Sequence, residues 1–228
     1  MDEIARGFIR AVELIIELNP EVIEVTLRSF LIALTSVTIA SLINVPLGSL
    51  IHFHHFPGRS GLINLIQTLY SIPTVTVGLF VFLLISREGP LGGYGLLYTP
   101  YGMIIGQTVL ITPVILGLTI SALSSVSEDI RDTAVSLGAD RFQTMWTVIV
   151  EARGPVLAAV LLGFGRALSE VGVAMMIGGN IRGYTRVLTT AIALETSMGN
   201  LEISIALGLI LISIALVVNT VVGRLQGW

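Results

Sequence analysis

The chain has 228 residues, of which 54% are hydrophobic and 12% charged, with a net charge of −3 and a mean hydropathy of +0.91. Soluble domains carry about twice this fraction of charged residues, so the composition excludes an ordinary soluble fold. Because the chain has no cysteine, disulfides, thiolate catalysis and cysteine-based metal sites are also excluded.

The first element is a predicted amphipathic helix over residues 3–18. Its apolar side carries Ile4, Phe8, Val12, Ile15 and Ile16, and its charged side carries Arg6, Arg10, Glu13 and Glu17. It is too short and too charged to cross a bilayer, so we expect residues 1–20 to lie flat at the membrane interface. Packing of this helix against the protein's own helices is an open alternative.

Long runs without a charged residue follow. A helix needs roughly 20 apolar residues to cross the hydrocarbon core, so these runs predict about five transmembrane helices. The predicted spans are residues 26–51, 62–86, 101–123, 155–177 and 201–222. Residues 87–102, rich in glycine, form a predicted loop, and residues 178–200 a long polar connector. We therefore predict an all-α polytopic membrane protein with a single transmembrane domain over residues 1–228.

A charged island interrupts this pattern between the third and fourth spans. Residues 132–153 read DTAVSLGADRFQTMWTVIVEAR, and the predicted loop that contains them extends over residues 124–154. Ser125 and Glu128 have the spacing of a capping box, Gly138 can end a helix, and Asp140 can cap the next one. The pattern predicts a helix–glycine–helix pair on the cytoplasmic face, held by a water-soluble partner. An amphipathic loop resting on lipid headgroups is the alternative.

Two opposite charges lie within the fourth predicted span. Arg166 and Glu170 are four residues apart and share a helix face with Ala159 and Gly163. An ionised group at this depth is normally paired or faces a wet cavity. We expect an Arg166–Glu170 ion pair that either fixes helix register or lines a path. A paired arginine is mostly neutralised, so the sequence does not favour Arg166 as a strong anion site.

Polar residues also follow the fourth span on the predicted outer face. The candidates are Asn180, Arg182, Thr185 and Arg186. Arginine and hydroxyl donors suit a tetrahedral oxyanion, but they equally suit an acidic protein surface or simple solvation.

Catalytic chemistry is disfavoured by the remaining motifs. Gly58-Arg59-Ser60-Gly61 matches the GxSG motif of intramembrane serine proteases. However, the three histidines of the chain are close to this motif in sequence, so a nucleophile and a base on separate helices cannot pair. No phosphate-binding loop of the GxxxxGK[ST] type is present. We expect no catalytic residue, no metal site and no cofactor bound by this chain.

The charged island resembles the EAA motif of ABC-importer permeases. The positions that match the acidic residue, the two alanines and the glycine of that motif are Asp132, Thr133, Ala134 and Gly138. Val148 and Val150 match the two later apolar positions, but Glu151 stands where the motif has proline. In that family the loop is the coupling helix that contacts the ATPase. The resemblance implies that Asp132, Thr133, Ala134, Gly138, Ala139 and Asp140 form the coupling contacts.

A second string closely resembles the permeases of tungstate ABC importers, with molybdate and sulfate permeases as relatives. It reads GFGRALSEVGVAMMIGGNIRGYTRVLTTAIALETSMGN, and the similarity extends over nearly the whole chain. The resemblance implies a type I (MetI-like) permease fold and a homodimer. It also implies a pair of cytoplasmic ATPases that hold ATP and Mg²⁺, and an extracytoplasmic oxyanion-binding protein.

Together these observations predict the membrane permease subunit of an ATP-driven importer for a tetrahedral oxyanion, most closely tungstate, with molybdate or sulfate as alternatives. Five spans and a cytoplasmic island place the N-terminus outside and the C-terminus inside, although the distribution of arginines does not decide the orientation. Nucleic acid is not an expected partner. The rival from another class is a self-contained secondary transporter or channel, but no convincing internal repeat supports it.

Overall fold

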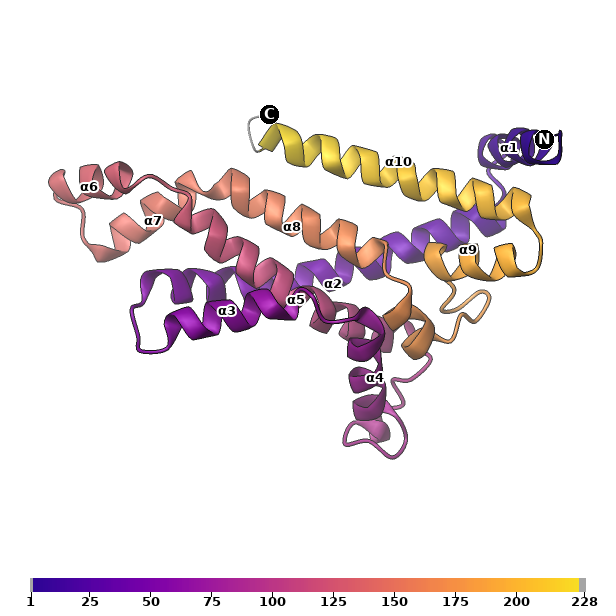
Figure 1. Cartoon of the computed structure of the whole chain (residues 1–228), viewed down its shortest axis with the longest axis horizontal. Coiled ribbons are helices and arrows are strands. Elements are labelled where there is room, and N and C mark those ends of the chain that lie inside the picture. Colours follow the sequence, from indigo (N-terminus) through magenta and orange to yellow (C-terminus); the bar gives the residue numbers. More distant parts are fainter. Residues whose placement is uncertain (1, 226–228) are drawn as a thin grey trace.

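The computed structural model describes residues 2–225, and the side chains from Gly7 onward. In this part of the chain every regular element is a helix, which confirms the all-α prediction (Figure 1). The α-helices are α1 (Asp2–Ile16), α2 (Pro20–Phe53), α3 (Arg59–Leu69), α4 (Thr74–Ile85), α5 (Pro100–Ser124), α6 (Glu128–Ser136), α7 (Arg141–Glu151), α8 (Arg153–Leu168), α9 (Leu188–Ser197) and α10 (Leu201–Leu225). A 3₁₀ turn, η1 (Gly92–Tyr94), and a π-helical turn, η2 (Ala174–Gly178), complete the set.

Three of these helices are long and apolar enough to cross a membrane: α2, α5 and α10. The number rises to five if each of two bent pairs counts as one span, namely α3 with α4 and α7 with α8. The long helices run along the longest axis of the molecule (Figure 1). The α6–α7 pair and the α2–α3 turn lie at one end of this axis, and α1, α9 and the start of α10 lie at the other.

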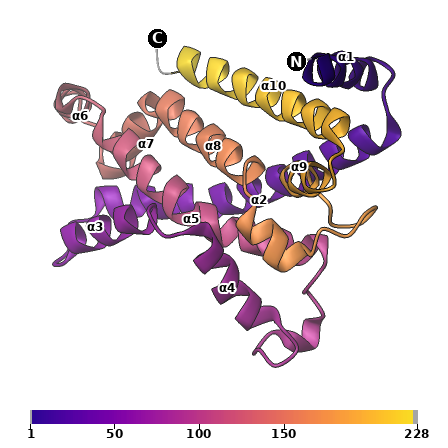
Figure 2. The same ribbon diagram turned by 45° about the vertical axis from the view of Figure 1, so that its right-hand side comes forward.

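The second predicted span is not one straight helix. The chain bends by 98° between α3 and α4, so α4 projects sideways from the bundle and carries the loop that follows it (Figures 1 and 2). Pro73 is the N-cap of α4. Proline lacks a backbone N–H and disfavours helical geometry in the preceding residue, so the helix breaks here although the apolar composition continues.

The fourth predicted span is also interrupted. It begins close to the predicted residue but α8 ends at Leu168, and a turn separates it from the short helical segment that contains η2. At its other end α8 follows α7 almost directly, across a bend of 58°. A movement of α7 therefore passes into α8 through a very short connection.

The packing of α2 on α5 is close because small residues lie between them. A side chain on Gly48 of α2 would place its Cβ 3.0 Å from a methyl carbon of Thr119. Ser36 is fully buried, and its hydroxyl lies 3.3 Å from the carbonyl of Ile104 and from the side chain of Gln107. Small and hydroxyl residues are typical of helix contacts in membranes, where they allow close approach and hydrogen bonding.

The first helix packs on the protein itself. Ala11 and Leu14 are buried against Ala206 of α10, which confirms the alternative that α1 contacts the chain's own helices (Figure 2). Phe8 and Ile16 remain 49% and 74% exposed on another side of α1. The helix therefore has a packing face and a second apolar face. The side chains of Ile4 and Arg6, part of the predicted pattern, lie outside the described residues.

Part of the predicted polar connector, residues 178–200, is buried in the hydrophobic core. It contains α9, whose Leu188 and Ala191 are buried in the main hydrophobic cluster with residues of α2, α5, α8 and α10. The backbone N–H of Leu188 donates to the hydroxyl of Ser29 on α2 at 2.6 Å. Only the parts of this segment before α9 and after it remain loops.

Candidate functional site

The charged island folds into the α6–α7 pair, at the end of the molecule where α2 and α5 end (Figure 1). The N-cap of α6 differs from the predicted one. The hydroxyl of Ser127 accepts the backbone N–H of Asp129 at 3.2 Å and starts α6, whereas the hydroxyl of Ser125 donates to the carbonyl of Ala122 at the end of α5. The capping box of Ser125 and Glu128 is therefore not formed, because α5 extends as far as Ser124.

The turn between the two helices has the predicted form. Gly138 adopts φ +84°, a left-handed conformation that residues with a side chain rarely take. The backbone N–H of Ala139 then donates to the carbonyl of Ala134 at 3.0 Å and closes α6. Asp140 and Gln143 form a reciprocal capping box, with distances of 2.8 and 2.9 Å, at the start of α7.

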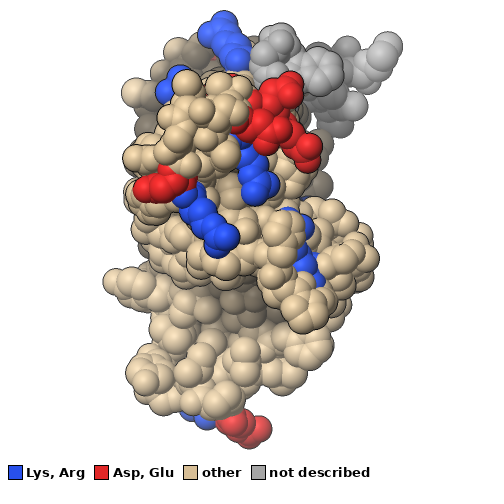
Figure 3. All heavy atoms as spheres, turned by 90° about the vertical axis from the view of Figure 1, so that its left-hand side faces the viewer, with Lys and Arg blue, Asp and Glu red and all other residues tan. Residues whose placement is uncertain are grey.

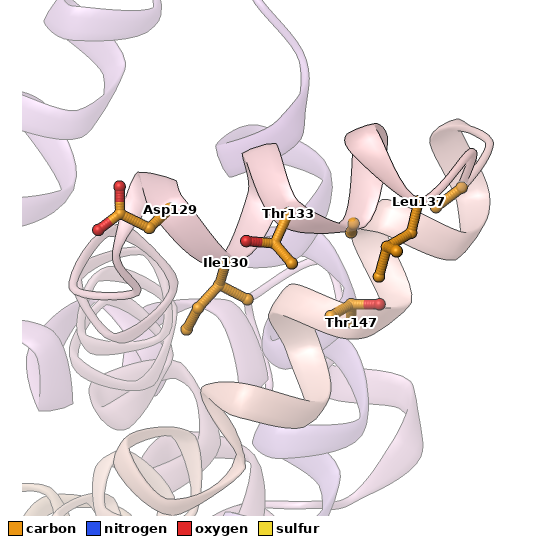
Figure 4. A pocket seen from close by; sticks show the side chains of 7 residues that line it. Asp129, Ile130, Thr133, Leu137 and Thr147 are labelled. Atoms are coloured by element: carbon orange, nitrogen blue, oxygen red, sulfur yellow. The ribbon is translucent and has the colours of Figure 1, made fainter.

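A cavity of about 440 Å³ lies between α6 and α7 (Figure 4). Ile130 and Leu137 extend from α6 toward α7, where Thr147 lies (Figure 4). The complete lining is Asp129, Ile130, Thr133, Ala134, Leu137, Ala139 and Thr147. It is mostly apolar and open to solvent.

Three of the six predicted coupling residues line this cavity: Thr133, Ala134 and Ala139. Gly138 and Asp140 shape the turn, and Asp132 is exposed. Sequence reasoning did not select Asp129, Ile130 or Thr147. The first two could have been found because they precede Thr133 and Ala134 by one helical turn. Thr147 enters only through the tertiary packing of α7 on α6.

Large apolar side chains are exposed around the tip of the α6–α7 pair. Leu137, Phe142 and Trp146 are 84%, 75% and 61% exposed. Seen from this end, charged side chains of both signs gather in the upper part of the molecule, and most of the lower part is uncharged (Figure 3). Exposed apolar residues rimmed by polar ones mark an interaction surface.

The opposite side of α7 is joined to the membrane helices. Val148 and Ala152 are buried against Leu123 of α5, with Phe53 of α2 packed on the same cluster. Any force applied at the tip therefore reaches α5 through packing and α8 through the short connection after Glu151.

The predicted ion pair in the fourth span is not formed. Among the ion pairs and side-chain hydrogen bonds within residues 7–225, none involves the guanidinium of Arg166, which is exposed. Glu170 is 4% exposed, and its carboxylate accepts the backbone N–H of Val173 at 3.1 Å. Because α8 ends at Leu168, the helical spacing on which the prediction rested does not continue to Glu170.

The outer-face candidates are mostly engaged within the protein. Arg182 contacts Glu21 at 2.7 Å, and Arg186 lies 3.5 Å from both Glu21 and Glu195. Thr185 is fully buried and accepts the backbone N–H of Ile181 at 3.0 Å.

Asn180 donates to the carbonyl of Thr190 at 3.3 Å. These contacts tie the loop before α9 to the start of α2 and to α9 itself. The arrangement therefore favours a scaffold over an oxyanion site at these four residues. Within the described residues, no group of three or more His, Cys, Asp or Glu could hold a metal ion.

Comparison with known proteins identifies the family. Residues 44–228 match the family model described as "Binding-protein-dependent transport system inner membrane component". The chain is 40% identical to the tungstate uptake system permease protein TupB of Peptoclostridium acidaminophilum, over 99% of both chains. It is 36% identical to the TupB of Campylobacter jejuni over 99% of this chain and 95% of that one, and 26% identical to the sulfate transport system permease protein CysT of Escherichia coli over 91% and 78%.

The fold also resembles that of a solved transporter. A crystal structure of a bacterial ABC transporter involved in import of the acidic polysaccharide alginate matches with a TM-score of 0.55 at 18% identity, over 87% of this chain and 79% of that one. The likeness shows that the type I permease fold predicted from the sequence is present. The chain belongs to the family of inner-membrane components of binding-protein-dependent transport systems, which are permease subunits rather than catalytic enzymes.

Proposed function

We propose that the chain is the membrane permease of an ATP-driven importer that takes up tungstate. The supporting observation is the near full-length similarity to two permeases named for tungstate uptake, at 40% and 36% identity. Sulfate permeases are more distant, at 26–30% identity. Molybdate and sulfate are the alternative substrates, since each is also a tetrahedral dianion.

ATP hydrolysis takes place on a separate ATPase, which holds the nucleotide and Mg²⁺. This chain carries no phosphate-binding loop of the GxxxxGK[ST] type. The α6–α7 pair docks on the ATPase, with the cavity between its helices and the exposed Phe142 and Trp146 as contact surface. Asp132, Thr133, Ala134, Gly138, Ala139 and Asp140 belong to this contact or shape it.

The α6–α7 end faces the cytoplasm, and the opposite end faces the extracytoplasmic side, where a binding protein delivers the anion. With five passes the N-terminus lies outside and the C-terminus inside. A second copy of the chain completes the transporter, because the few spans of one protomer are not enough to enclose a path. When ATP closes the ATPase pair, the α6–α7 pairs move with it and tilt α5 and α8 of each protomer.

Reconstitution tests this function. Proteoliposomes that contain the permease, its ATPase and the oxyanion-binding protein should transport tungstate only when ATP is present on the side of the membrane that carries the ATPase. Competition by molybdate and sulfate ranks the alternatives. Equal uptake by the permease alone, without the ATPase or ATP, would instead support the secondary transporter or channel.

A further inference from the structure

Arg166 occupies an unusual position for a basic residue. It lies 13 residues after Arg153, the first residue of α8, which is about 20 Å along a helix that rises about 1.5 Å per residue. The hydrocarbon core of a bilayer is about 30 Å thick. The next basic residues along the chain, Arg153 and Arg182, lie before α8 enters the membrane and in the loop beyond it. Arg166 is therefore the one cation in this stretch at membrane depth.

The expected neutralising partner is directed elsewhere. Glu170 caps the short helical segment that follows the break, through the backbone N–H of Val173, and its own carbonyl accepts the hydroxyl of Thr189 at 2.7 Å. Both contacts hold Glu170 in the interior. Within residues 7–225, the guanidinium of Arg166 thus has no carboxylate partner.

The side of α8 that carries Arg166 is open and partly polar. By the rule of about 100° per residue, Leu162, Gly165 and Ser169 lie within about 100° of Arg166 around the helix. A Cβ on Gly165 would meet nothing within 4 Å, and Ser169 is exposed. The backbone at this point is consequently accessible to a ligand that contacts the guanidinium.

A cavity continues from this side toward the cytoplasmic end. It has a volume of about 180 Å³ and lies between α5 and α8. Its lining is Leu118, Ser121, Ala122, Ser125, Pro155, Ala159 and Leu162. Leu162, which lines the cavity, precedes Arg166 by one turn, so the cavity lies on the same side of α8 as the arginine, although Arg166 does not line it. A water molecule takes about 30 Å³ in the liquid, so the cavity has room for a small oxyanion with a few waters.

We propose that this α5–α8 face lines one side of the oxyanion's route, which a second copy of the chain encloses, and that Arg166 is a charged contact site on that route. The inference rests on the proposed function. A guanidinium at membrane depth is costly in lipid but not beside a water-filled path. It can bind a tetrahedral dianion with two parallel N–H donors. The hydroxyl of Ser121 provides a neutral contact in the cavity on the same side of α8, and a route with one charged contact and neutral neighbours stays weak enough for release.

The test compares variants in proteoliposomes that contain the permease, its ATPase and the binding protein. Arg166→Gln should lower the initial rate of tungstate uptake by about 10- to 100-fold, the effect of losing charge-assisted hydrogen bonds. Arg166→Lys should restore most of the rate because it keeps the charge. Glu170→Gln should transport nearly as well as the wild type, because its amide oxygen still accepts the N–H of Val173. ATP hydrolysis stimulated by the binding protein should persist in all variants.

Leu157→Gln is the matched control, since Leu157 is exposed on the opposite side of α8. Equal uptake by Arg166→Gln and this control would overturn the inference. So would loss of the dimer in Arg166→Gln, or an equal loss of uptake in Glu170→Gln, because either result would assign Arg166 to a structural ion pair. Failure of the wild type to transport tungstate would count against the proposed function itself, and the inference would fall with it.

Discussion

Gly138 allows the coupling surface to be tested without altering any contact. A Cβ at this position would meet nothing within 4 Å, so a substitution acts only through the backbone, whose φ is +84°. The left-handed conformation costs an ordinary L-residue about 1–2 kcal/mol, whereas asparagine tolerates it better. Since 1.4 kcal/mol corresponds to a factor of 10, Gly138→Ala should weaken binding of the ATPase by up to roughly 5- to 30-fold, and Gly138→Asn by less.

The assay is titration of the ATPase subunit onto the permease in nanodiscs. Gly208→Ala is the control, because Gly208 lies inside α10 with equally open surroundings but ordinary helical geometry, where alanine is favourable. We expect the affinity order wild type, Gly138→Asn, Gly138→Ala, with Gly208→Ala at the wild-type value. Wild-type affinity in Gly138→Ala would refute the argument that the turn presents the docking surface.

Two further substitutions test other parts of the structure. Trp146→Ala removes a large side chain that is 61% exposed at the tip of the α6–α7 pair. Loss of a central contact of this kind should weaken ATPase binding by about 2 kcal/mol or more. The same titration measures the affinity, and an unchanged value would exclude Trp146 from the contact. Thr185→Val preserves shape but leaves the buried carbonyl of Gly178 without its donor and the partly buried N–H of Ile181 without its acceptor, which should cost about 1–3 kcal/mol. Thermal unfolding of the purified permease should then begin at a lower temperature, and an unchanged melting temperature would show that this loop is not a stability element.

Local rules succeeded where a few neighbouring residues decide the structure. The helix–glycine–helix form followed from Gly138 and from the Asp140–Gln143 spacing, because capping and left-handed turns depend on residues within one turn of one another. The long apolar helices were equally accessible, since hydrophobic length alone determines which segments can cross a bilayer.

The direction of a helix, and the place where it bends, cannot be predicted from its amino-acid composition. The bend before α4 was missed because residues 62–86 contain no charged residue on either side of Pro73 and are long enough for a single span. The packed α9 was missed for the opposite reason, because polar residues surround the few apolar ones, such as Leu188, that reach the core. In both cases the three-dimensional neighbours decide the outcome.

The charged residues show the same limit. Glu170 and Arg166 have the spacing of an intrahelical pair, but the helix ends between them and the carboxylate caps the next segment. Arg186 was a candidate for binding an anion, yet Glu21 of α2 and Glu195 of α9 both lie 3.5 Å from its guanidinium. Which charged residues pair depends on tertiary contacts, and the spacing of residues in the sequence does not predict them.

Site-directed labelling tests most directly the claim that a soluble ATPase grips the α6–α7 pair from the cytoplasm. The chain has no cysteine, so Leu137→Cys introduces a single thiol at a position that is 84% exposed. A membrane-impermeant maleimide should label it in inside-out vesicles but not in right-side-out vesicles, and added ATPase should protect it. Labelling from the extracytoplasmic side, or labelling that the ATPase does not reduce, would contradict the account.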